Sequence, residues 1–384
     1  MFPAVLSSLL MLSVFSTGAI AQVPLDSIPN SRTLPEEYPE SWVIVQDLNY
    51  PTMVLGSYII IDVAAKTDQV KGQFQGAQFA GFAWPKKRAE LYVAESYYEN
   101  VGYGQRSDLV TIYEPANLQP IARISLPGNK RAFMTPRSAM TRLTGNEQFL
   151  LIFNFTPAAS VTVVDMEQRT VAGEVQIPGC TFIYPYADQS FFTLCGGGSL
   201  AHFTLNEAGN VTDEGMTDPF NDIDRDAMYM TPGVFDQVFY FPTQLGNLQP
   251  VKLSGAKPEI LPGWSLISEE EKQERWRPVK RETVDVDRYG TLYVLMHRVG
   301  MDGSHVGGTS EVWTFDPAAQ ERIGRIGLRK DASALAVTGE DSPHLVVISG
   351  NGFGVYDAKT GEFVQEIGGW WEDATTFQLI HTNK

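Results

Sequence analysis

The chain has 384 residues, of which 43% are hydrophobic and 19% charged, and its formal net charge is −16 at pH 7. This acidic balance argues against nucleic acid as a partner, because phosphate binding requires a basic surface. The 34 glycines and 23 prolines favour many turns over long helices.

The N-terminal segment has the features of an export signal. Residues Met1–Ala21 are apolar for about a dozen positions and end on Ala19-Ile20-Ala21, an A-x-A-like cleavage site. The segment lacks Lys and Arg, and a membrane anchor is the alternative, but the run is shorter than the about 20 residues that span a bilayer. We expect cleavage near Ala21, an N-terminal extension over residues 22–50, and no membrane-spanning segment further on.

A hairpin pattern repeats along the rest of the chain. Each copy has an apolar strand, an acidic or small polar turn residue, and a returning strand, as in YIIIDVAAKTDQVKGQF and EVWTFDPAAQERIGRIGL. Asp or Asn at such a position accepts hydrogen bonds from its own turn. The turn residues, about 49 positions apart on average, are Asp62, Glu114, Asp165, Asn206, Ser254, Asp316 and Asp357. One such hairpin per four-stranded blade predicts an all-β, seven-bladed β-propeller over residues 51–384.

Two further segments depart from this pattern. YVAESYYENVGYGQRSDLVTIYEP, Tyr92–Pro115, predicts a strand, a polar loop with two glycines and Arg106, and a second strand. SEEEKQERW, Ser268–Trp276, predicts a short charged helix.

Cys180 and Cys195 are the two cysteines of the chain. In an exported protein an isolated pair favours a disulfide, and no histidine lies within a few residues of Cys180 to support metal binding. We therefore predict a disulfide.

Motifs for chemistry are weak throughout. Asp222, Asp224 and Asp226 alternate as at the start of a calcium loop, but the glycine at the sixth position is missing, which favours a solvated acidic loop. The spacing of His297 and His305 matches no metal motif. Without G-x-S-x-G, H-E-x-x-H or P-loop signatures, the sequence predicts no catalytic residue and no metal site in this chain. It predicts a scaffold with loops on both faces.

Four stretches resemble a known family. Tyr92–Pro127 resembles the heavy-subunit signature of the quinone-dependent periplasmic amine dehydrogenases, a loop R-G-x-R-[TS]-D before V-x-V-[YF]-[DE], although Tyr103 replaces the first arginine. Thr156–Asp165 and the glycine-rich stretch after Cys195 are similar to further family motifs. Pro262–Pro278, followed by Tyr293–Asp316, is closest to the aromatic amine dehydrogenase branch, while the methylamine dehydrogenase heavy chain is also similar.

The resemblance implies a seven-bladed heavy subunit that assembles as two heavy and two light chains in the periplasm. It implies that the light chain carries the tryptophan tryptophylquinone cofactor and the catalytic base. Primary amines, with arylalkylamines favoured by the aromatic branch, would become aldehyde and ammonia. Electrons would pass to a small copper protein of the azurin or amicyanin kind.

The resemblance also implies two groups of site residues. The family has a phenylalanine on the substrate route that aligns with Gln78, beside Phe79, and the alternative is that Phe79 is a core aromatic between blades. The expected light-chain contact is the Tyr92–Pro115 segment, which a charged pair would hold rigid. The alternative is that this pair is a salt bridge internal to the loop, without a role in the contact. Its residues are Tyr97, Tyr98, Tyr103, Arg106 and Asp108.

Two other functions remain open at this point. The chain could be a propeller that has lost its light chain and acts as a binding module. A free-standing propeller hydrolase is disfavoured, because no clustered acid–base set is visible.

Overall fold

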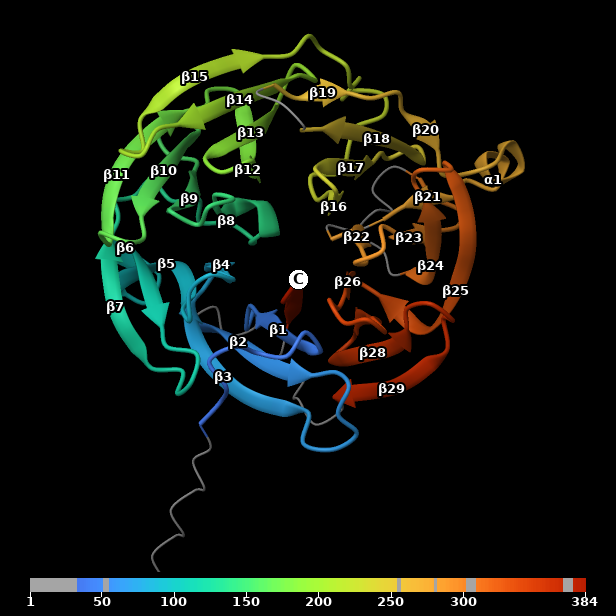
Figure 1. Ribbon diagram of the computed structural model, residues 1–384, viewed down its shortest axis with the longest axis horizontal. Helices are drawn as coiled ribbons and strands as arrows, with labels where there is room; N and C mark the ends of the chain where they lie inside the picture. The colour runs from blue at the N-terminus through green and yellow to red at the C-terminus, as the bar shows by residue number, and fades with distance from the viewer. Residues whose placement is uncertain (1–32, 51–54, 254–256, 280–281, 302–308, 369–375) are drawn as a thin grey trace, which may run out of the picture. The chain divides into compact units, whose positions relative to one another are not determined.

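Seven antiparallel sheets are arranged around an axis in the compact unit Leu34–Lys384 (Figure 1). The computed structural model describes residues 33–50, 55–253, 257–279, 282–301, 309–368 and 376–384. The expected signal segment, Ser254 and His305 lie outside the described residues. The seven sheets confirm the predicted seven-bladed β-propeller. Within the described ranges, no helix has the length and apolar character needed to cross a membrane.

The blades are numbered in chain order, with strands given from the axis outward (Figure 1). Blade 1 consists of β30 (Phe377–Thr382), β1 (Trp42–Asp47), β2 (Leu55–Asp62) and β3 (Val70–Ala77). Blade 2 consists of β4 (Gly81–Ala83), β5 (Leu91–Asn100), β6 (Tyr103–Tyr113) and β7 (Pro120–Ser125). Blade 3 consists of β8 (Thr141–Leu143), β9 (Phe149–Asn154), β10 (Ser160–Asp165) and β11 (Thr170–Gln176), preceded by the 3-10 turn η1 (Ser138–Met140). Blade 4 consists of β12 (Cys180–Tyr186), β13 (Ser190–Cys195), β14 (Leu200–Leu205) and β15 (Val211–Met216).

The remaining blades carry short additions. Blade 5 consists of β16 (Gly233–Phe235), β17 (Val238–Pro242), β18 (Asn247–Lys252) and β19 (Glu259–Ile260), with β20 (Trp264–Ser265) also paired to β18. Blade 6 consists of β21 (Arg277–Pro278) and β22 (Val284–Val286), both paired to β23 (Leu292–His297), then β24 (Thr309–Asp316) and β25 (Glu321–Ala332). Blade 7 consists of β26 (Ala334–Val337), β27 (His344–Ser349), β28 (Gly352–Asp357) and β29 (Phe363–Gly368).

The ring closes between the two ends of the chain. The last strand, β30, pairs antiparallel with β1, from Val43 opposite Thr382 to Asp47 opposite Phe377. Strand β1 lies within residues 22–50, the range assigned to an N-terminal extension, so the propeller begins before residue 51. The sequence repeat was counted on outer hairpins, and β1 is an inner strand that precedes the first of them.

The predicted turn residues join the two outer strands of the blades. Asp165 Oδ1 accepts hydrogen bonds from the amides of Glu167 and Gln168 at 2.9 and 2.8 Å. Asp62, Asn206, Asp316 and Asp357 accept bonds from their own turns in the same way. The expected local capping by Asp and Asn is therefore confirmed at these positions.

The predicted charged helix is also present, although it is short. Helix α1 spans Glu269–Gln273, and Ser268 and Glu271 form a reciprocal capping box at its start. It stops early because Arg275 adopts the left-handed conformation, with φ of 59°.

Strand direction divides the connections between two faces of the ring. Because neighbouring strands alternate in direction, the turns with Asp62 to Asp357 all lie on one face, which we call the acidic-turn face. The turns between second and third strands, and the segments that lead to the next blade, lie on the opposite face. We call it the connection face.

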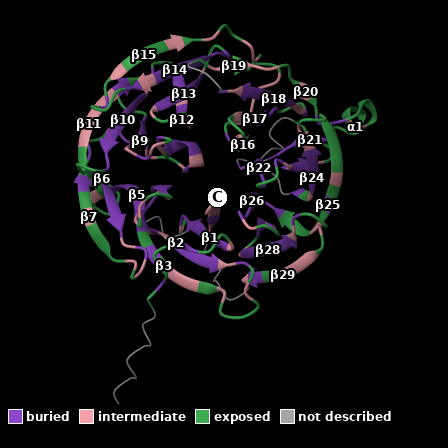
Figure 2. Cartoon of the chain, in the orientation of Figure 1, coloured by how far each residue is buried: buried purple, intermediate pink, exposed green. Residues whose placement is uncertain are grey.

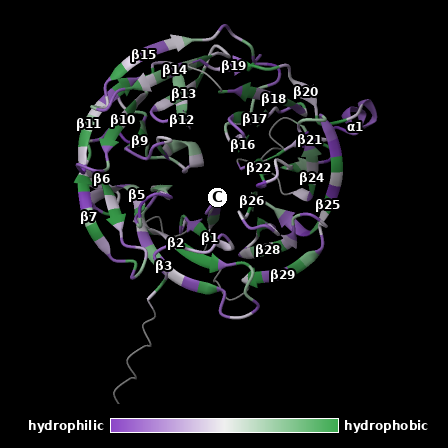
Figure 3. Cartoon of the chain, in the orientation of Figure 1, coloured by the Kyte–Doolittle hydropathy of each residue, from purple (hydrophilic) through white to green (hydrophobic). Residues whose placement is uncertain are grey.

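The core lies between neighbouring blades. Tyr58 and Phe74 of blade 1 stack with ring centroids 5.0 Å apart, and both pack with Phe82 of blade 2. The inner strands are buried and largely hydrophobic, whereas the outer strands alternate between buried and exposed positions (Figures 2 and 3). Packing between radial sheets therefore holds the ring together.

A buried carboxylate lies near the axis on the connection-face side. Glu282, which is 8% exposed, precedes β22 and forms a parallel bridge with Ala334. Its carboxylate accepts hydrogen bonds from Ser138 Oγ at 3.2 Å and Thr231 Oγ1 at 3.4 Å. Burial raises the pKa of Glu282 to about 7, although Arg137 and these hydroxyls oppose the shift.

The disulfide predicted from the sequence is confirmed. Cys180 and Cys195 are directly opposite each other in the β12–β13 pair and are bonded. Replacing both by alanine should lower the free energy of unfolding by about 3 kcal/mol, since the crosslink restricts the unfolded chain. Guanidinium unfolding should show this loss, and a reductant should destabilise the wild type but leave the double variant unchanged.

Glu282 should give the fold a specific pH dependence. Because its folded pKa is raised, the protonated form stabilises the fold below the unfolded pKa, and this contribution is lost as the pH rises through 7. Relative to Glu282→Gln, the wild type should lose roughly 2–3 kcal/mol of unfolding free energy between pH 5 and pH 8. Unfolding at four pH values checks this, and a difference that does not change with pH would contradict it.

Candidate functional site

The segment expected to be a polar loop is a long β-hairpin. Strands β5 and β6 pair up to Asn100 and Tyr103, and only Val101 and Gly102 form the turn. The expected loop was wrong because cross-strand pairing extends through the YGQRSD stretch. Strand alternation then places Ser96, Tyr98, Arg106 and Asp108 on one face of the hairpin.

The predicted charged pair lies at the base of this hairpin. Arg106 Nε donates to Asp108 Oδ1 at 2.7 Å, and Ser96 Oγ donates to the same oxygen at 2.6 Å. Asp108 is 3% exposed, so it supports the hairpin from within and leaves the surface to its neighbours. All of these partners belong to this chain.

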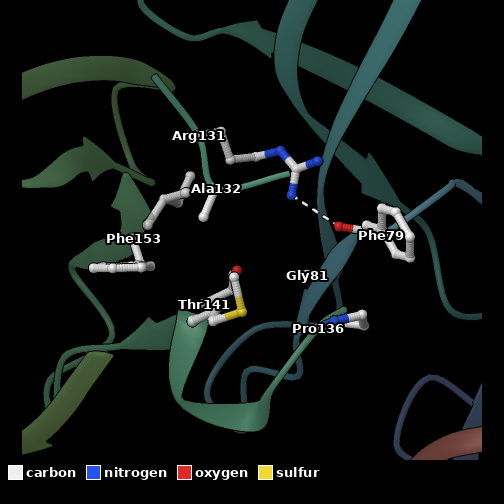
Figure 4. Close-up of a pocket in the computed structure, with 9 residues that line it drawn as sticks. Phe79, Gly81, Arg131, Ala132, Pro136, Thr141 and Phe153 are labelled. Carbon is white, nitrogen blue, oxygen red and sulfur yellow. Dashed lines mark hydrogen bonds between the residues drawn. The ribbon is translucent and has the colours of Figure 1, made fainter. Parts of the chain in front are cut away.

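Arg131, which the sequence analysis did not identify, completes the network. Its Nε donates to Ser96 Oγ at 2.8 Å, and its Nη1 donates to the carbonyl of Phe79 at 2.9 Å (Figure 4). It is buried, and burial lowers the pKa of its guanidinium to about 10. No local pattern marks it, because its partners lie 35 and 52 positions away in the chain.

Phe79 belongs to an aromatic cluster on the connection face. Its ring meets Phe133 edge-on at 5.2 Å between centroids, and Tyr98 also meets Phe133 edge-on, at 5.5 Å. Tyr50 lies 6.3 Å from Phe79, and the Arg106 guanidinium lies 5.5 Å from the Phe133 centroid. We call Tyr50, Phe79, Tyr98 and Phe133 the aromatic cluster. Phe79 is half-buried here, while Gln78 beside it is buried.

The space below Phe79 is closed in this chain. Phe79, Gly81, Arg131 and Phe153 are among the residues that line a pocket too small for a water molecule (Figure 4). Gly81 is required there, because a Cβ would lie 2.0 Å from Thr141 Oγ1.

Tyr97 and Tyr103, the other two tyrosines predicted to contact the light chain, lie in different places on the hairpin. Tyr97 points to the opposite face of the hairpin, where its hydroxyl donates to Glu95 at 2.9 Å. Tyr103 is 72% exposed and Val101 75% exposed at the hairpin tip.

Exposed apolar side chains gather on the connection face. Phe155, Ile223 and Met230 line a groove of about 440 Å³ beside the disulfide. Exposed apolar clusters on a soluble protein mark contact surfaces. Further exposed members on this face are Tyr50, Met134, Leu245, Val299 and Met301.

A second cleft, of about 460 Å³, lies between blades 6 and 7 on the acidic-turn face. Asp287 and Asp357 line it, but each carboxylate accepts hydrogen bonds from its own turn. None of the predicted site residues lines this cleft.

The acidic loop considered for calcium binding is held by hydrogen bonds within this chain. Asp226 accepts hydrogen bonds from Thr243, Leu245 and Asn247, which hold a loop together. In the described ranges no group of three or more His, Cys, Asp or Glu side chains is placed to hold a metal ion.

One described pair of tryptophans lies close together, but it does not fit a quinone cofactor made from two tryptophans. Trp276 and Trp313 lie 4.9 Å apart, but both are buried in the core of blade 6. Their indole N–H groups donate to Glu274 and Glu311, at 2.9 and 2.7 Å. This pair therefore packs the blade and does not face a substrate.

Fold and surface together define a seven-bladed propeller with one apolar, aromatic face. The family model for the methylamine dehydrogenase heavy chain (MADH) matches residues 42–377. The chain belongs to the methylamine dehydrogenase heavy chain family. This confirms the resemblance to the methylamine dehydrogenase heavy chain, whereas the resemblance to the aromatic amine dehydrogenase branch stays a prediction.

Individual relatives agree with this family. The methylamine dehydrogenase heavy chain of Methylophilus methylotrophus is 27% identical over 282 residues, covering 72% of this chain and 69% of that protein. That of Methylobacillus flagellatus is 24% identical over 339 residues, covering 87% and 82%. That of Methylorubrum extorquens is 26% identical over 278 residues, covering 71% and 67%.

Two solved structures share the fold. Dihydro-heme d1 dehydrogenase NirN in complex with DHE has a TM-score of 0.55 at 12% identity, covering 91% of this chain and 67% of that one. A putative 6-phosphogluconolactonase from Bacteroides fragilis has a TM-score of 0.57 at 9% identity, covering 88% and 97%. At such identities the likeness concerns the fold alone.

Asp108 should be essential to the stability of the hairpin. Asp108→Ala leaves the Arg106 guanidinium and the Arg131 backbone amide without their carboxylate acceptor, and the free energy of unfolding should fall by about 3 kcal/mol. Asp331→Ala, which removes an exposed carboxylate of β25, should change it by less than about 0.5 kcal/mol. Chemical denaturation of both variants gives the comparison, and equal losses would contradict the role of Asp108.

Proposed function

We propose that this chain is the heavy subunit of a tryptophan tryptophylquinone amine dehydrogenase and holds the catalytic light chain on its connection face. The observation that carries the proposal is the gathering of exposed apolar and aromatic side chains on that face, around Phe79. Aromatic and aliphatic groups of this kind supply the buried centre of protein interfaces. Membership of the heavy chain family supports the same partner.

The heavy chain contributes to the reaction by positioning the light chain and by bordering the route of the amine. The light chain's quinone, when present, supplies the oxidation of a primary amine to aldehyde and ammonia. Tyr103 and Val101 at the hairpin tip contact the light chain, while Arg106 and Asp108 keep the hairpin rigid below them. Phe79 faces the junction between the subunits and borders the route of the amine.

The substrate class follows from the surroundings of that junction. The aromatic cluster suits an aryl group, which favours arylalkylamines and agrees with the resemblance to the aromatic amine dehydrogenase branch. A net charge of −16 attracts protonated amines to the protein. The chain is exported to the periplasm after cleavage near Ala21 and assembles as two heavy and two light chains. Its electrons pass to an azurin- or amicyanin-like cupredoxin.

Co-expression with the light chain tests the proposal. Val101→Ser/Tyr103→Ser should weaken light-chain binding at least about tenfold, because it removes two exposed contact side chains. Tyr289→Ser/Ile323→Ser is the matched control, since these side chains are 63% and 59% exposed away from the connection face, and it should leave binding unchanged. The measurement is light-chain retention on a tagged heavy chain, read from quinone absorbance and a titrated Kd.

Two outcomes would overturn the proposal. A wild-type chain that retains no light chain would instead be a propeller binding module. Equal weakening by the two double variants would place the light chain elsewhere on the ring.

A further inference from the structure

The geometry points to Arg131 and Gln46 as positioning residues that fix the Phe79 turn and thereby set the selectivity of the amine route. This inference rests on the proposed function, because it assumes that Phe79 borders that route. It concerns residues of this chain that hold Phe79 in place and do not themselves touch the amine.

The turn that carries Phe79 is strained. Phe79 has a φ of 55°, the left-handed conformation, which is costly for a residue with a bulky side chain. Such a conformation persists only where the surroundings over-determine it, and strained residues of this kind cluster at functional sites. The strain places the Phe79 ring against Phe133 on the connection face, while Ala80, the next residue, is buried in the core.

Side chains from outside the turn hold two consecutive carbonyls. Arg131 Nη1 donates to the Phe79 carbonyl at 2.9 Å, and Gln46 Nε2 donates to the Ala80 carbonyl at 2.7 Å. At the start of the turn, the Ala77 amide donates to Glu95 Oε2 at 2.9 Å. Within the turn itself, the Ala80 amide donates to the Ala77 carbonyl at 3.2 Å.

The holding groups come from three separate parts of the ring. Gln46 lies on β1 of blade 1, Glu95 on β5 of blade 2, and Arg131 on the segment that leads to blade 3. They are 2%, 1% and 4% exposed, so water does not compete for their hydrogen bonds. The turn is therefore fixed relative to three blades at once.

Arg131 also ties the turn to the hairpin. Its Nε donates to Ser96, which donates in turn to Asp108. The backbone carbonyl of Arg131 accepts a hydrogen bond from Arg106 Nη2 at 2.5 Å. The hairpin that presents Tyr103 to the light chain and the turn that presents Phe79 to the amine share this one guanidinium. Their relative placement is thus set within the heavy chain.

A purely stabilising role explains Arg131 poorly. A buried guanidinium is costly to desolvate, and apolar packing of the same volume is often at least as stable. Arg131 Nε and Nη1 donate to a hydroxyl and a backbone carbonyl, which fix a position, while its Nη2 has no hydrogen-bond partner among the described residues. This use fits a site where geometry matters more than stability.

The test compares Arg131→Met with Arg123→Met, an exposed arginine of the neighbouring strand β7. Gln46→Leu is a second variant that releases the other carbonyl, and Arg131→Lys is the conservative variant that keeps one donor. All are made in the full heavy chain and purified with its light chain. Steady-state kinetics use 2-phenylethylamine and methylamine, and hydrogen–deuterium exchange follows the peptide containing residues 77–81.

Arg131→Met and Gln46→Leu should each speed exchange in this peptide by about tenfold, through loss of a carbonyl contact. Both variants should change KM for 2-phenylethylamine by about tenfold, while kcat stays within about twofold of the wild-type value. The ratio of kcat/KM for 2-phenylethylamine to kcat/KM for methylamine should therefore change as well. Arg131→Lys should restore part of both effects, and Arg123→Met should show neither.

Each other outcome counts against the inference. Unchanged exchange in both variants shows that these side chains do not fix the turn. Faster exchange with unchanged KM and amine ratio shows that the turn does not govern selectivity. If the wild type retains no light chain, the proposed function fails and the selectivity role fails with it, while exchange on the isolated chain still decides whether Arg131 and Gln46 hold Phe79.

Discussion

The pairing of β30 with β1 is the constraint on which the rest of the structure depends. It joins the two ends of the described chain in one sheet, so blade 1 is completed to four strands. Residues of β1 such as Val43 and Ile44 are then buried between blades. Gln46 on the same strand reaches the Ala80 carbonyl of the next blade connection. Closing the ring therefore also sets the position of the Phe79 turn.

The two faces of the ring have different physical characters, and strand direction separates them. On the acidic-turn face, carboxylates such as Asp165 and Asp357 are satisfied by the amides of their own turns. On the connection face, the hairpin tip and the β9–β10 turn expose apolar side chains such as Tyr103 and Phe155. These carboxylates therefore need no partner to complete their hydrogen bonds. The connection face gains stability when a partner covers it.

The fold could be predicted from the sequence because the repeated strand–turn–strand pattern depends on neighbouring residues only. An Asp that caps its own turn, as at Asp316, needs only the next few residues. The Arg106–Asp108 pair could be predicted because the two residues are close in the sequence. The disulfide could be predicted because the chain has two cysteines and an expected oxidising compartment. The hairpin was mistaken for a loop because its glycines and charges hide the cross-strand pairing. Gln46, Glu95 and Arg131 had no signal, because they meet the Phe79 turn only after three blades have packed.

Contacts between residues far apart in the sequence also determine what the chain can contribute to a catalytic assembly. Trp276 and Trp313 are packed inside blade 6, so this pair offers no quinone precursor at the surface. The described residues do bring a buried guanidinium, a buried carboxylate and a strained phenylalanine to one junction. Keeping charge out of water is costly, and that cost is offset only where fixed geometry has value. A rigid ring can supply such geometry to a small partner, because its blades hold the turn from several sides at once.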